Sequence, residues 1–217
     1  MEWRLLEGVP EEEVRQLLSV ARRRRFGRNE VVFHRHDPAD SLHLVTKGKF
    51  AIRVTTPIGE TVTIALRGPG DSFGEMGVVA GGIARSATVT ALEEAETFAV
   101  YEGDFERLRE RFRPINEALI AFLAEQVRLL NERLVEALYV PADRRVLRRL
   151  SELAELYADS GSNIEVPLTQ EALAELAGTS RATVNRVLRG EEARGTVRLR
   201  RGRTTVVDHV ALARRAR

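Results

Sequence analysis

The sequence predicts an α+β chain in three parts: an N-terminal antiparallel β-roll, a long helix, and a C-terminal winged helix-turn-helix. Three observations predict these parts. Short β-rich runs separated by glycine-containing turns fill residues 31–101, a texture typical of antiparallel rolls and barrels. Residues 114–138 keep one uninterrupted helical pattern. Residues 169–189 hold two short helical patterns joined by a glycine turn, and a β-hairpin pattern follows them.

Length and composition limit the class of protein. A chain of 217 residues with 43% hydrophobic residues is long enough for two modest domains with packed cores. No apolar run approaches the roughly 20 residues of a membrane span, and the acidic N-terminal segment does not look like a secretory signal. We therefore expect a cytoplasmic protein with no membrane partner. The absence of cysteine excludes disulfides, cysteine-based zinc and iron–sulfur sites, and thiol catalysis.

The N-terminal part begins with a predicted helix over residues 10–18, because Pro10 stands at its first turn and acidic residues follow near its positive end. The β-rich runs that we expect to be strands are residues 31–34, 41–45, 50–56, 60–66, 86–92 and 97–101. Lys47-Gly48-Lys49 and residues 57–60 are predicted hairpin turns. A helix over residues 103–112 ends this part.

Apolar residues divide the long helix into two stripes. One stripe holds Leu119, Leu123, Val127, Leu130, Leu134 and Leu138, and the other holds Ile115, Phe122 and Leu129. Two apolar stripes need two partners. We expect one stripe to pack on the β-roll and the other to meet the same helix of a second chain, which forms a homodimer. A long core helix in a monomer is the alternative interpretation.

Val140-Pro141 interrupts the helical pattern, and Asp143 is a candidate N-cap for a new helix over residues 144–157. The domain boundaries follow from this break. We expect an N-terminal helix and β-roll effector domain at residues 1–113, a dimerisation helix at 114–139, and a winged helix-turn-helix domain at 140–217.

Charge is distributed unevenly along the chain, whose net charge is +2. Residues 1–142 carry 19 basic and 22 acidic residues, whereas residues 143–217 carry 15 arginines and 10 acidic residues. The last forty residues hold 11 arginines against three acidic residues. A basic C-terminal block on an acidic remainder indicates a polyanionic partner.

The basic block contains the helix-turn-helix pattern TQEALAELAGTSRATVNRVLR. Thr169 is predicted to cap its first helix, Gly178 to end that helix, and Ser180 to cap the second helix. Polar side chains on the second helix cannot all be buried at low cost, and arginine is suited to phosphates and guanine edges. Double-stranded DNA is therefore the predicted partner. The residues predicted to contact it are Thr169, Thr179, Ser180, Arg181, Thr183, Asn185, Arg186 and, in the turn of the hairpin, Arg203.

Phe73-Gly74-Glu75-Met76-Gly77, followed by Arg85-Ser86-Ala87, resembles the phosphate-binding cassette of the catabolite activator (CRP/FNR) family of bacterial transcription regulators. The order of roll, long helix and winged helix-turn-helix is similar along nearly the whole chain. The resemblance implies a homodimeric regulator that binds a palindromic operator, contacts RNA polymerase and is gated by a cyclic nucleotide. Cyclic AMP (cAMP) is the candidate effector.

The resemblance also assigns roles within the cassette. Gly74 would let the backbone approach the sugar-phosphate, and Glu75 would accept a hydrogen bond from the ribose 2′-hydroxyl. Arg85 would neutralise the cyclic phosphate, and Ser86 would donate one more hydrogen bond to it. The residues implied to bind the nucleotide are Gly74, Glu75, Met76, Arg85, Ser86, Leu130 and Asn131.

The sequence departs from the family pattern at two places. Where the cAMP sensors of the family have a Thr-Ser pair on the long helix, this chain has Leu129-Leu130 followed by Asn131, and leucine cannot hydrogen-bond a purine. The second helix reads Arg181-Ala182 where Arg-Glu is usual, so an acceptor for cytosine N4 is missing. We expect an operator that is read less strictly or that differs from the familiar one.

Several alternatives stay open. The first alternative is that Glu75 and Arg85 pair with each other without a ligand. The second is that the chain is a regulator that acts without ligand and is controlled by its abundance. A third is the cyclic-nucleotide-binding module of an enzyme, although no catalytic motif is present and we expect no enzymatic activity. Histidines 34, 36 and 43 are interpreted as ordinary strand or surface residues, so no metal or haem is expected. Residues 158–163 are the candidate loop for RNA polymerase, and the choice between activation and repression is left open.

Overall fold

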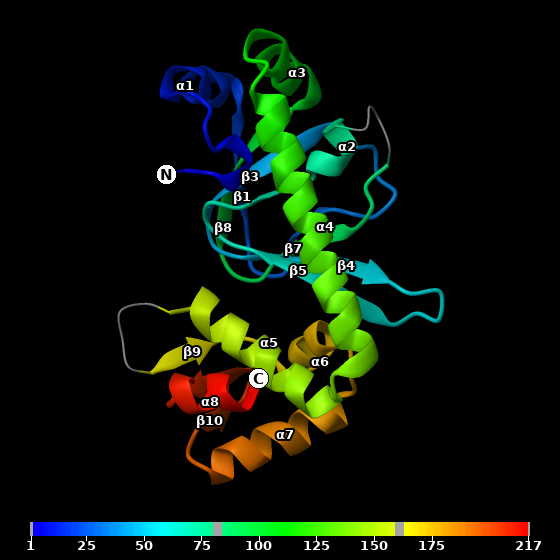
Figure 1. Cartoon of the computed structure of the whole chain (residues 1–217), viewed down its shortest axis with the longest axis vertical. Coiled ribbons are helices and arrows are strands. Elements are labelled where there is room, and N and C mark those ends of the chain that lie inside the picture. Colours follow the sequence, from blue (N-terminus) through cyan, green and yellow to red (C-terminus); the bar gives the residue numbers. More distant parts are fainter. Residues whose placement is uncertain (1, 80–83, 159–162, 217) are drawn as a thin grey trace. The chain divides into compact units, whose positions relative to one another are not determined.

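The computed structural model describes residues 2–79, 84–158 and 163–216, which form two compact units, residues 1–129 and 130–217. The division falls inside α4 (Ile115–Tyr139), the long helix that the sequence predicts (Figure 1). None of the described helices is long and apolar enough to cross a membrane.

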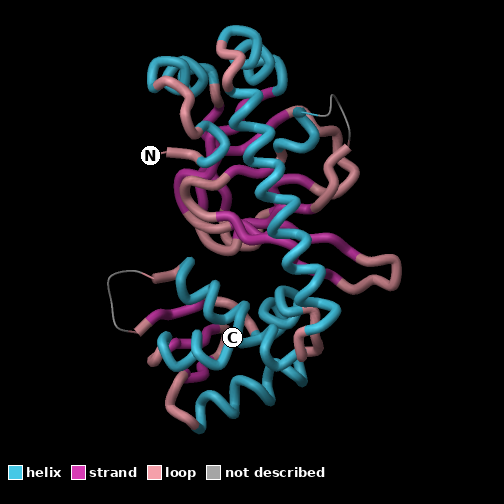
Figure 2. Tube along the Cα trace, viewed as in Figure 1, coloured by secondary structure: helices cyan, strands magenta, loops and turns pink. Residues whose placement is uncertain are grey.

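The first unit is a β-roll with helices packed against it (Figures 1 and 2). Its strands are β1 (Arg22–Phe26), β2 (Val31–Phe33), β3 (Ser41–Lys47), β4 (Phe50–Thr55), β5 (Thr61–Arg67), β6 (Ser72–Phe73), β7 (Thr88–Ala91) and β8 (Ala95–Tyr101). Its helices, besides the first part of α4, are the 3-10 turn η1 (Arg4–Leu6), α1 (Glu11–Val20), α2 (Glu75–Val79) and α3 (Glu102–Arg111). The expected strands are present, and β1 and β6 are additions to them.

The strands form two four-stranded antiparallel sheets, in the orders β1-β8-β3-β6 and β2-β7-β4-β5. β4 and β5 form the hairpin expected around residues 57–60. The hairpin expected at Lys47-Gly48-Lys49 is wrong, because β3 and β4 belong to different sheets and this turn leads from one sheet to the other. Gly48 has a φ of +74°, and a Cβ at this position would lie 2.6 Å from the Cβ of Ala95. Only glycine therefore suits the crossing.

β3 lies between the two hydrophobic clusters of the first unit. Side chains alternate along a strand, so Leu42 and Leu44 face the cluster made with α1, α3 and the start of α4. Val45 faces the interior of the roll, which holds Phe26, Phe50 and Phe73. β3 is consequently buried on both faces.

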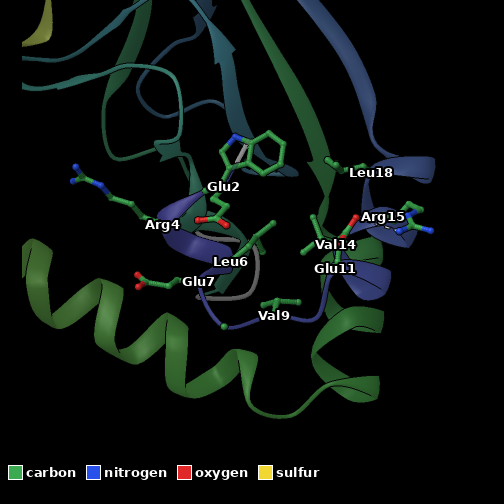
Figure 3. A pocket seen from close by; sticks show the side chains of 11 residues that line it. Glu2, Arg4, Leu6, Glu7, Val9, Glu11, Val14, Arg15 and Leu18 are labelled. Carbon is green, nitrogen blue, oxygen red and sulfur yellow. Dashed lines mark hydrogen bonds and ion pairs between the residues drawn. The ribbon is translucent and has the colours of Figure 1, made fainter.

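The N-terminal segment is attached to the roll through Trp3. Its indole Nε1 donates a hydrogen bond to the main-chain oxygen of Val45 at 3.0 Å. A groove of about 820 Å³ lies between this segment and α1, and Leu6, Val9 and Val14 line it (Figure 3). None of the predicted site residues belongs to this groove.

The second unit is a winged helix-turn-helix built on α5 (Ala142–Leu156) (Figure 1). The elements after α5 are β9 (Ile164–Val166), α6 (Gln170–Ala177), α7 (Arg181–Ala193), β10 (Val197–Arg200), β11 (Arg203–Val206) and α8 (His209–Ala216). Apolar residues of α5, α6 and α7, among them Leu150, Leu173 and Leu188, are buried and form its core. The hairpin β10–β11 gains a third strand, β9, which the sequence did not indicate.

The two stripes of α4 do not follow the predicted division. Ile115 and Leu119 are both buried, although they were assigned to opposite stripes. Further along the helix the predicted first stripe is exposed from Val127 to Leu138. The reason is that the first unit covers only the beginning of α4, so the surroundings of one stripe change along its length.

Candidate functional site

Gly74 links β6 to α2 and allows two segments of the chain to approach closely. Its φ is +85°, and a Cβ there would lie 2.8 Å from Nη1 of Arg85 and 3.1 Å from the main-chain oxygen of Ser41. A side chain at this position would be strained by the backbone conformation and would also collide with its neighbours. The chain therefore needs glycine where the cassette begins.

Glu75 follows directly and opens α2, with only 7% of the residue exposed. Its Oε2 is buried and has no hydrogen-bond partner among the described residues. Burial raises the pKa of the Glu75 carboxyl, while its own backbone N–H and the charges of Arg67 and Arg85 lower it. A buried acceptor without a donor is costly, so this oxygen is suited to a donor supplied by a ligand.

Arg85 is buried beside Gly74 and is held by backbone and side-chain oxygens. Its Nη1 donates to the main-chain oxygens of Ser41 at 2.6 Å and of Gly74 at 3.2 Å, and its Nη2 lies 3.3 Å from Oδ1 of Asp40. The guanidinium carbon is 4.0 Å from the ring centre of Phe33, which is the geometry of a cation–π contact. Its Nε has no hydrogen-bond partner in the described part of the chain, and burial lowers the pKa of the Arg85 guanidinium.

Glu75 and Arg85 do not form an ion pair with each other in the described structure, which excludes the simplest alternative interpretation of the cassette. Arg85 pairs with Asp40 instead, and no described residue forms a hydrogen bond with Glu75 Oε2. The reason is geometric, because the guanidinium is turned toward the start of β3.

The remaining cassette residues lie at the surface. Met76 is 58% exposed, and its Sδ lies 3.9 Å from the Ser86 hydroxyl, which is also exposed. The structure thus brings Gly74, Glu75, Met76, Arg85 and Ser86 together. Leu130 and Asn131 belong to the second unit, where both are exposed on α4.

Two residues near the cassette were not assigned to its surroundings from the sequence. Arg67 on β5 donates to the side chain of Gln126 on α4 at 2.6 Å, and its charge acts on Glu75. His43 lies inside the roll, stacked on Phe73, and burial together with the charges of Arg85 and Arg24 lowers its pKa to about 3. The neutral His43 fits its interpretation as a strand residue, and the described residues contain no group that could hold a metal ion.

The helix-turn-helix has the caps that the sequence predicts. The Thr169 hydroxyl accepts a hydrogen bond from the backbone N–H of Ala172, and the Ser180 hydroxyl accepts one from Thr183. Gly178 ends α6 in the left-handed conformation, with a φ of +57°. These caps fix where α7 begins and therefore which of its side chains are exposed.

The exposed face of α7 and the wing together form the candidate nucleic-acid interface. Arg181 and Asn185 line a groove of about 580 Å³ together with Thr169 and the wing residue Arg203. Arg181 makes no ion pair with any described residue, whereas Arg203 pairs with Glu165 of β9 at 2.9 Å. Thr183 is partly buried, and its hydroxyl lies 3.0 Å from that of Ser180. Thr179 is half-buried in the turn.

Asp143 does not cap α5, which corrects the sequence interpretation. The residue before the helix is Pro141, and Asp143 lies in the first turn, where its carboxylate pairs with Arg186 of α7. The sequence favours Asp143 as an N-cap because it comes just after the helix break at Val140-Pro141, but its distant partner has no local signature in the sequence.

Arg145, two residues further along α5, was also missed. Its Nη1 donates to the main-chain oxygen of Val140 at 2.9 Å, just beyond α4. Its Nε and Nη2 donate to the main-chain oxygens of Ala177 at 2.9 Å and Gly178 at 2.8 Å, at the end of α6. One side chain therefore ties the end of α4 to the turn of the helix-turn-helix.

Comparisons with known proteins agree with this arrangement. Residues 23–112 match the model of the cyclic nucleotide-binding domain, and residues 144–215 match that of the Crp-like helix-turn-helix domain. The chain is 35% identical over 208 residues to the cyclic AMP receptor protein of Thermus thermophilus, covering 96% of this chain and 94% of the relative. It is 32% identical over 219 residues to the CRP-like cAMP-activated global transcriptional regulator of Mycobacterium tuberculosis, covering 98% and 96%.

A solved structure supports the same assignment. The crystal structure of the catabolite activator protein of Thermus thermophilus matches with a TM-score of 0.57 and 34% identity over 98% of both chains. The two domain matches occur in the expected order, and the relatives are similar over almost their whole length. Both findings point to the same family. The chain belongs to the CRP/FNR family of transcription regulators, with a cyclic nucleotide-binding domain followed by a Crp-like helix-turn-helix domain.

Proposed function

We propose that this regulator is a homodimer that binds a palindromic operator and is gated by a cyclic nucleotide, with cAMP as the effector. The observation that carries the gating is Oε2 of Glu75, which is buried near Arg85 and has no hydrogen-bond partner among residues 2–79, 84–158 and 163–216. A ribose hydroxyl would satisfy this acceptor, and a cyclic phosphate would meet the positive charge of Arg85 and the exposed Ser86 hydroxyl. The relatives named cAMP receptor protein and cAMP-activated regulator support the choice of nucleotide.

The purine end of the site is proposed to involve Leu130 and Asn131 of α4. Both side chains are exposed, and the amide of Asn131 offers a donor and an acceptor where a leucine offers neither. Replacement of Asn131 by alanine should therefore reduce the preference for cAMP over cyclic GMP.

The dimer is proposed to form through the exposed apolar stripe of α4. Its members are Ile120, Val127, Leu130, Leu134 and Leu138, each at least half exposed. At 100° per residue these five positions lie within about 80° of one another around the helix. Such a stripe on one helix suits a second copy of the same helix.

At the DNA, we propose that α7 enters the major groove, with Arg186 at a guanine and Arg203 of the wing at the phosphates. Contact with RNA polymerase is part of the same proposal. The loop suggested for it lies mostly outside the described residues, at 159–162.

A regulator that acts without ligand is the second candidate, and one observation favours it. Arg85 already has oxygen partners in Ser41, Gly74 and Asp40, so its charge is not left unmatched in the ligand-free chain.

Calorimetric titration of the full chain with cAMP and with cyclic GMP separates the two candidates. Gating predicts saturable heat for wild type with cAMP, its loss in Glu75→Gln, and tighter operator binding when cAMP is present. No heat with either nucleotide, together with operator binding that needs no addition, favours the regulator that acts without ligand.

A further inference from the structure

Asp143 and Arg186 form an ion pair with two hydrogen bonds between the first turn of α5 and the recognition helix α7. Nη1 of Arg186 lies 2.9 Å from Oδ2 of Asp143, and Nη2 lies 2.5 Å from Oδ1. The bond to Arg186 lowers the pKa of the Asp143 carboxyl, and the bond to Asp143 raises the pKa of Arg186. Both groups are therefore charged at neutral pH.

The pair alters how much positive charge α7 presents. Non-specific attraction to DNA grows with the number of cations that neutralise phosphates. Arg186 is matched by Asp143, whereas Arg181 on the same helix has no ion-pair partner among the described residues. Arg186 is therefore weakened as a phosphate contact even though its side chain is 65% exposed.

The pair leaves Arg186 able to read a base. A guanidinium has five N–H donors, and Asp143 engages one hydrogen on each Nη. The Nε–H and the outer Nη hydrogens stay available for the O6 and N7 acceptors of guanine. The carboxylate also restricts the guanidinium to one orientation, which favours an acceptor of fixed geometry over a phosphate that can be met from many directions.

We propose that Asp143 is a specificity-determining residue of the DNA-binding unit: by neutralising and orienting Arg186, it suppresses attachment to phosphates and preserves recognition of a guanine. This inference rests on the proposed function of α7 as the helix that reads the operator. Asp143 need not touch DNA, so it is a positioning residue, and its effect is on the ratio of specific to non-specific affinity.

The test uses the full chain with Asp143→Asn, which keeps the shape of the side chain and removes its charge. Affinities for a selected operator duplex and for a scrambled duplex of the same length are measured by fluorescence anisotropy at several salt concentrations, with and without cAMP. We expect tighter binding to the scrambled duplex and a salt slope steeper by about 1.8, which is 0.9 for each Arg186 freed in a dimer. Affinity for the operator should increase less, so the ratio of operator affinity to scrambled-duplex affinity falls by about threefold or more.

Matched variants separate this role from a structural one. Glu165→Gln frees Arg203 in a pair of similar exposure, and because Arg203 is a proposed phosphate contact, both duplexes should gain equally. Asp143→Glu keeps the charge and should keep a ratio close to that of wild type. In an Arg186→Ala background, Asp143→Asn should change neither the ratio nor the slope.

One result would overturn the inference: an Asp143→Asn affinity ratio equal to that of wild type, whether both duplexes bind as before or are weakened equally, with the fold intact by circular dichroism. If wild type itself fails to prefer any selected duplex over the scrambled one, the proposed function of α7 fails. A specific wild type with an unchanged variant refutes only the role of Asp143.

Discussion

Arg85 binds Ser41 twice: Nη1 donates to its main-chain oxygen at 2.6 Å, and Nη2 donates to its hydroxyl at 3.1 Å. Ser41 is the first residue of β3, which lies between the two hydrophobic clusters of the first unit. The cation of the cassette is therefore fixed to a strand that is buried over most of its length, and its substitution affects stability as well as ligand binding.

Arg85→Lys should weaken both properties. A single ammonium cannot reproduce the bonds to Ser41, Gly74 and Asp40, so we expect a loss of stability of about 1–2 kcal/mol. Affinity for cAMP should fall by about tenfold or more, because the charge-assisted contact of the guanidinium with the phosphate is lost. Urea unfolding and calorimetry measure the two effects. Arg25→Lys on the exposed strand β1 is the control and should change neither.

Gly74→Ala should destabilise the protein more than Gly59→Ala does. Both glycines have a similar positive φ, +85° and +86°, so the backbone strain of alanine is matched. A Cβ at Gly59 meets nothing within 4 Å, whereas a Cβ at Gly74 lies 2.8 Å from Arg85. We expect about 1 kcal/mol for Gly59→Ala and about 1–3 kcal/mol more for Gly74→Ala by chemical unfolding. Equal losses of stability would show that Arg85 and Ser41, the neighbours of Gly74, move aside without cost.

Glu75 should make the ligand-free protein less stable as the pH rises. Burial raises the pKa of its carboxyl above the 4.5 of an ordinary glutamate, so at a pH between these two values the folded state keeps a proton that the unfolded state has released. This contribution to stability is complete below about pH 4.5 and is lost as the pH rises through the folded-state pKa. Glu75→Gln removes the titration and should be more stable than ligand-free wild type at pH 7 by about 1–3 kcal/mol. Urea unfolding from pH 4.5 to 8 compares them, and parallel curves would contradict the assignment.

Leu130→Glu combined with Leu134→Glu should give a monomer. Both leucines are more than half exposed in the single chain, so the change costs little folding energy but places charges in the proposed dimer contact. Sedimentation velocity measures the change, and operator affinity should fall with it. Val20→Glu, at an equally exposed apolar residue outside α4, is the control. A double variant that still sediments as a dimer would place the interface elsewhere.

Arg186→Ala and Arg203→Ala should differ in what they remove. We expect Arg186→Ala to lose discrimination at one guanine in each half-site by about tenfold or more, since two hydrogen bonds to O6 and N7 disappear. Arg203→Ala should weaken all sequences alike and lower the salt slope by about one per protomer. Titrations on an operator and its single-base variants measure both. Uniform weakening by Arg186→Ala would make that residue a phosphate contact.

The helix-turn-helix could be predicted in detail because its signals are local. Thr169, Gly178 and Ser180 act on backbone groups within four residues, and the structure places each as expected. The domain order and the cassette followed from equally local patterns. Such features depend little on the rest of the fold.

What escaped prediction depends on contacts between distant segments. β1 reads Arg-Arg-Arg-Arg-Phe, which has no apolar alternation, yet it pairs with β8 along its whole length. The turn at Gly48 resembles a hairpin, and only the pairing of β3 with β8 shows that it joins two sheets. The stripe of α4 keeps its period where its surroundings change, so periodicity alone could not separate its buried residues from its exposed ones.

The hydrogen bonds of Arg145 determine which substitutions this protein can accept during evolution. Its three closest acceptors are the main-chain oxygens of Val140, Ala177 and Gly178, and every amino acid carries such an oxygen. Substitution of the side chains at those three positions leaves the acceptors in place. Mutations that break this link between the end of α4 and the helix-turn-helix are therefore concentrated in a single codon, the one for residue 145.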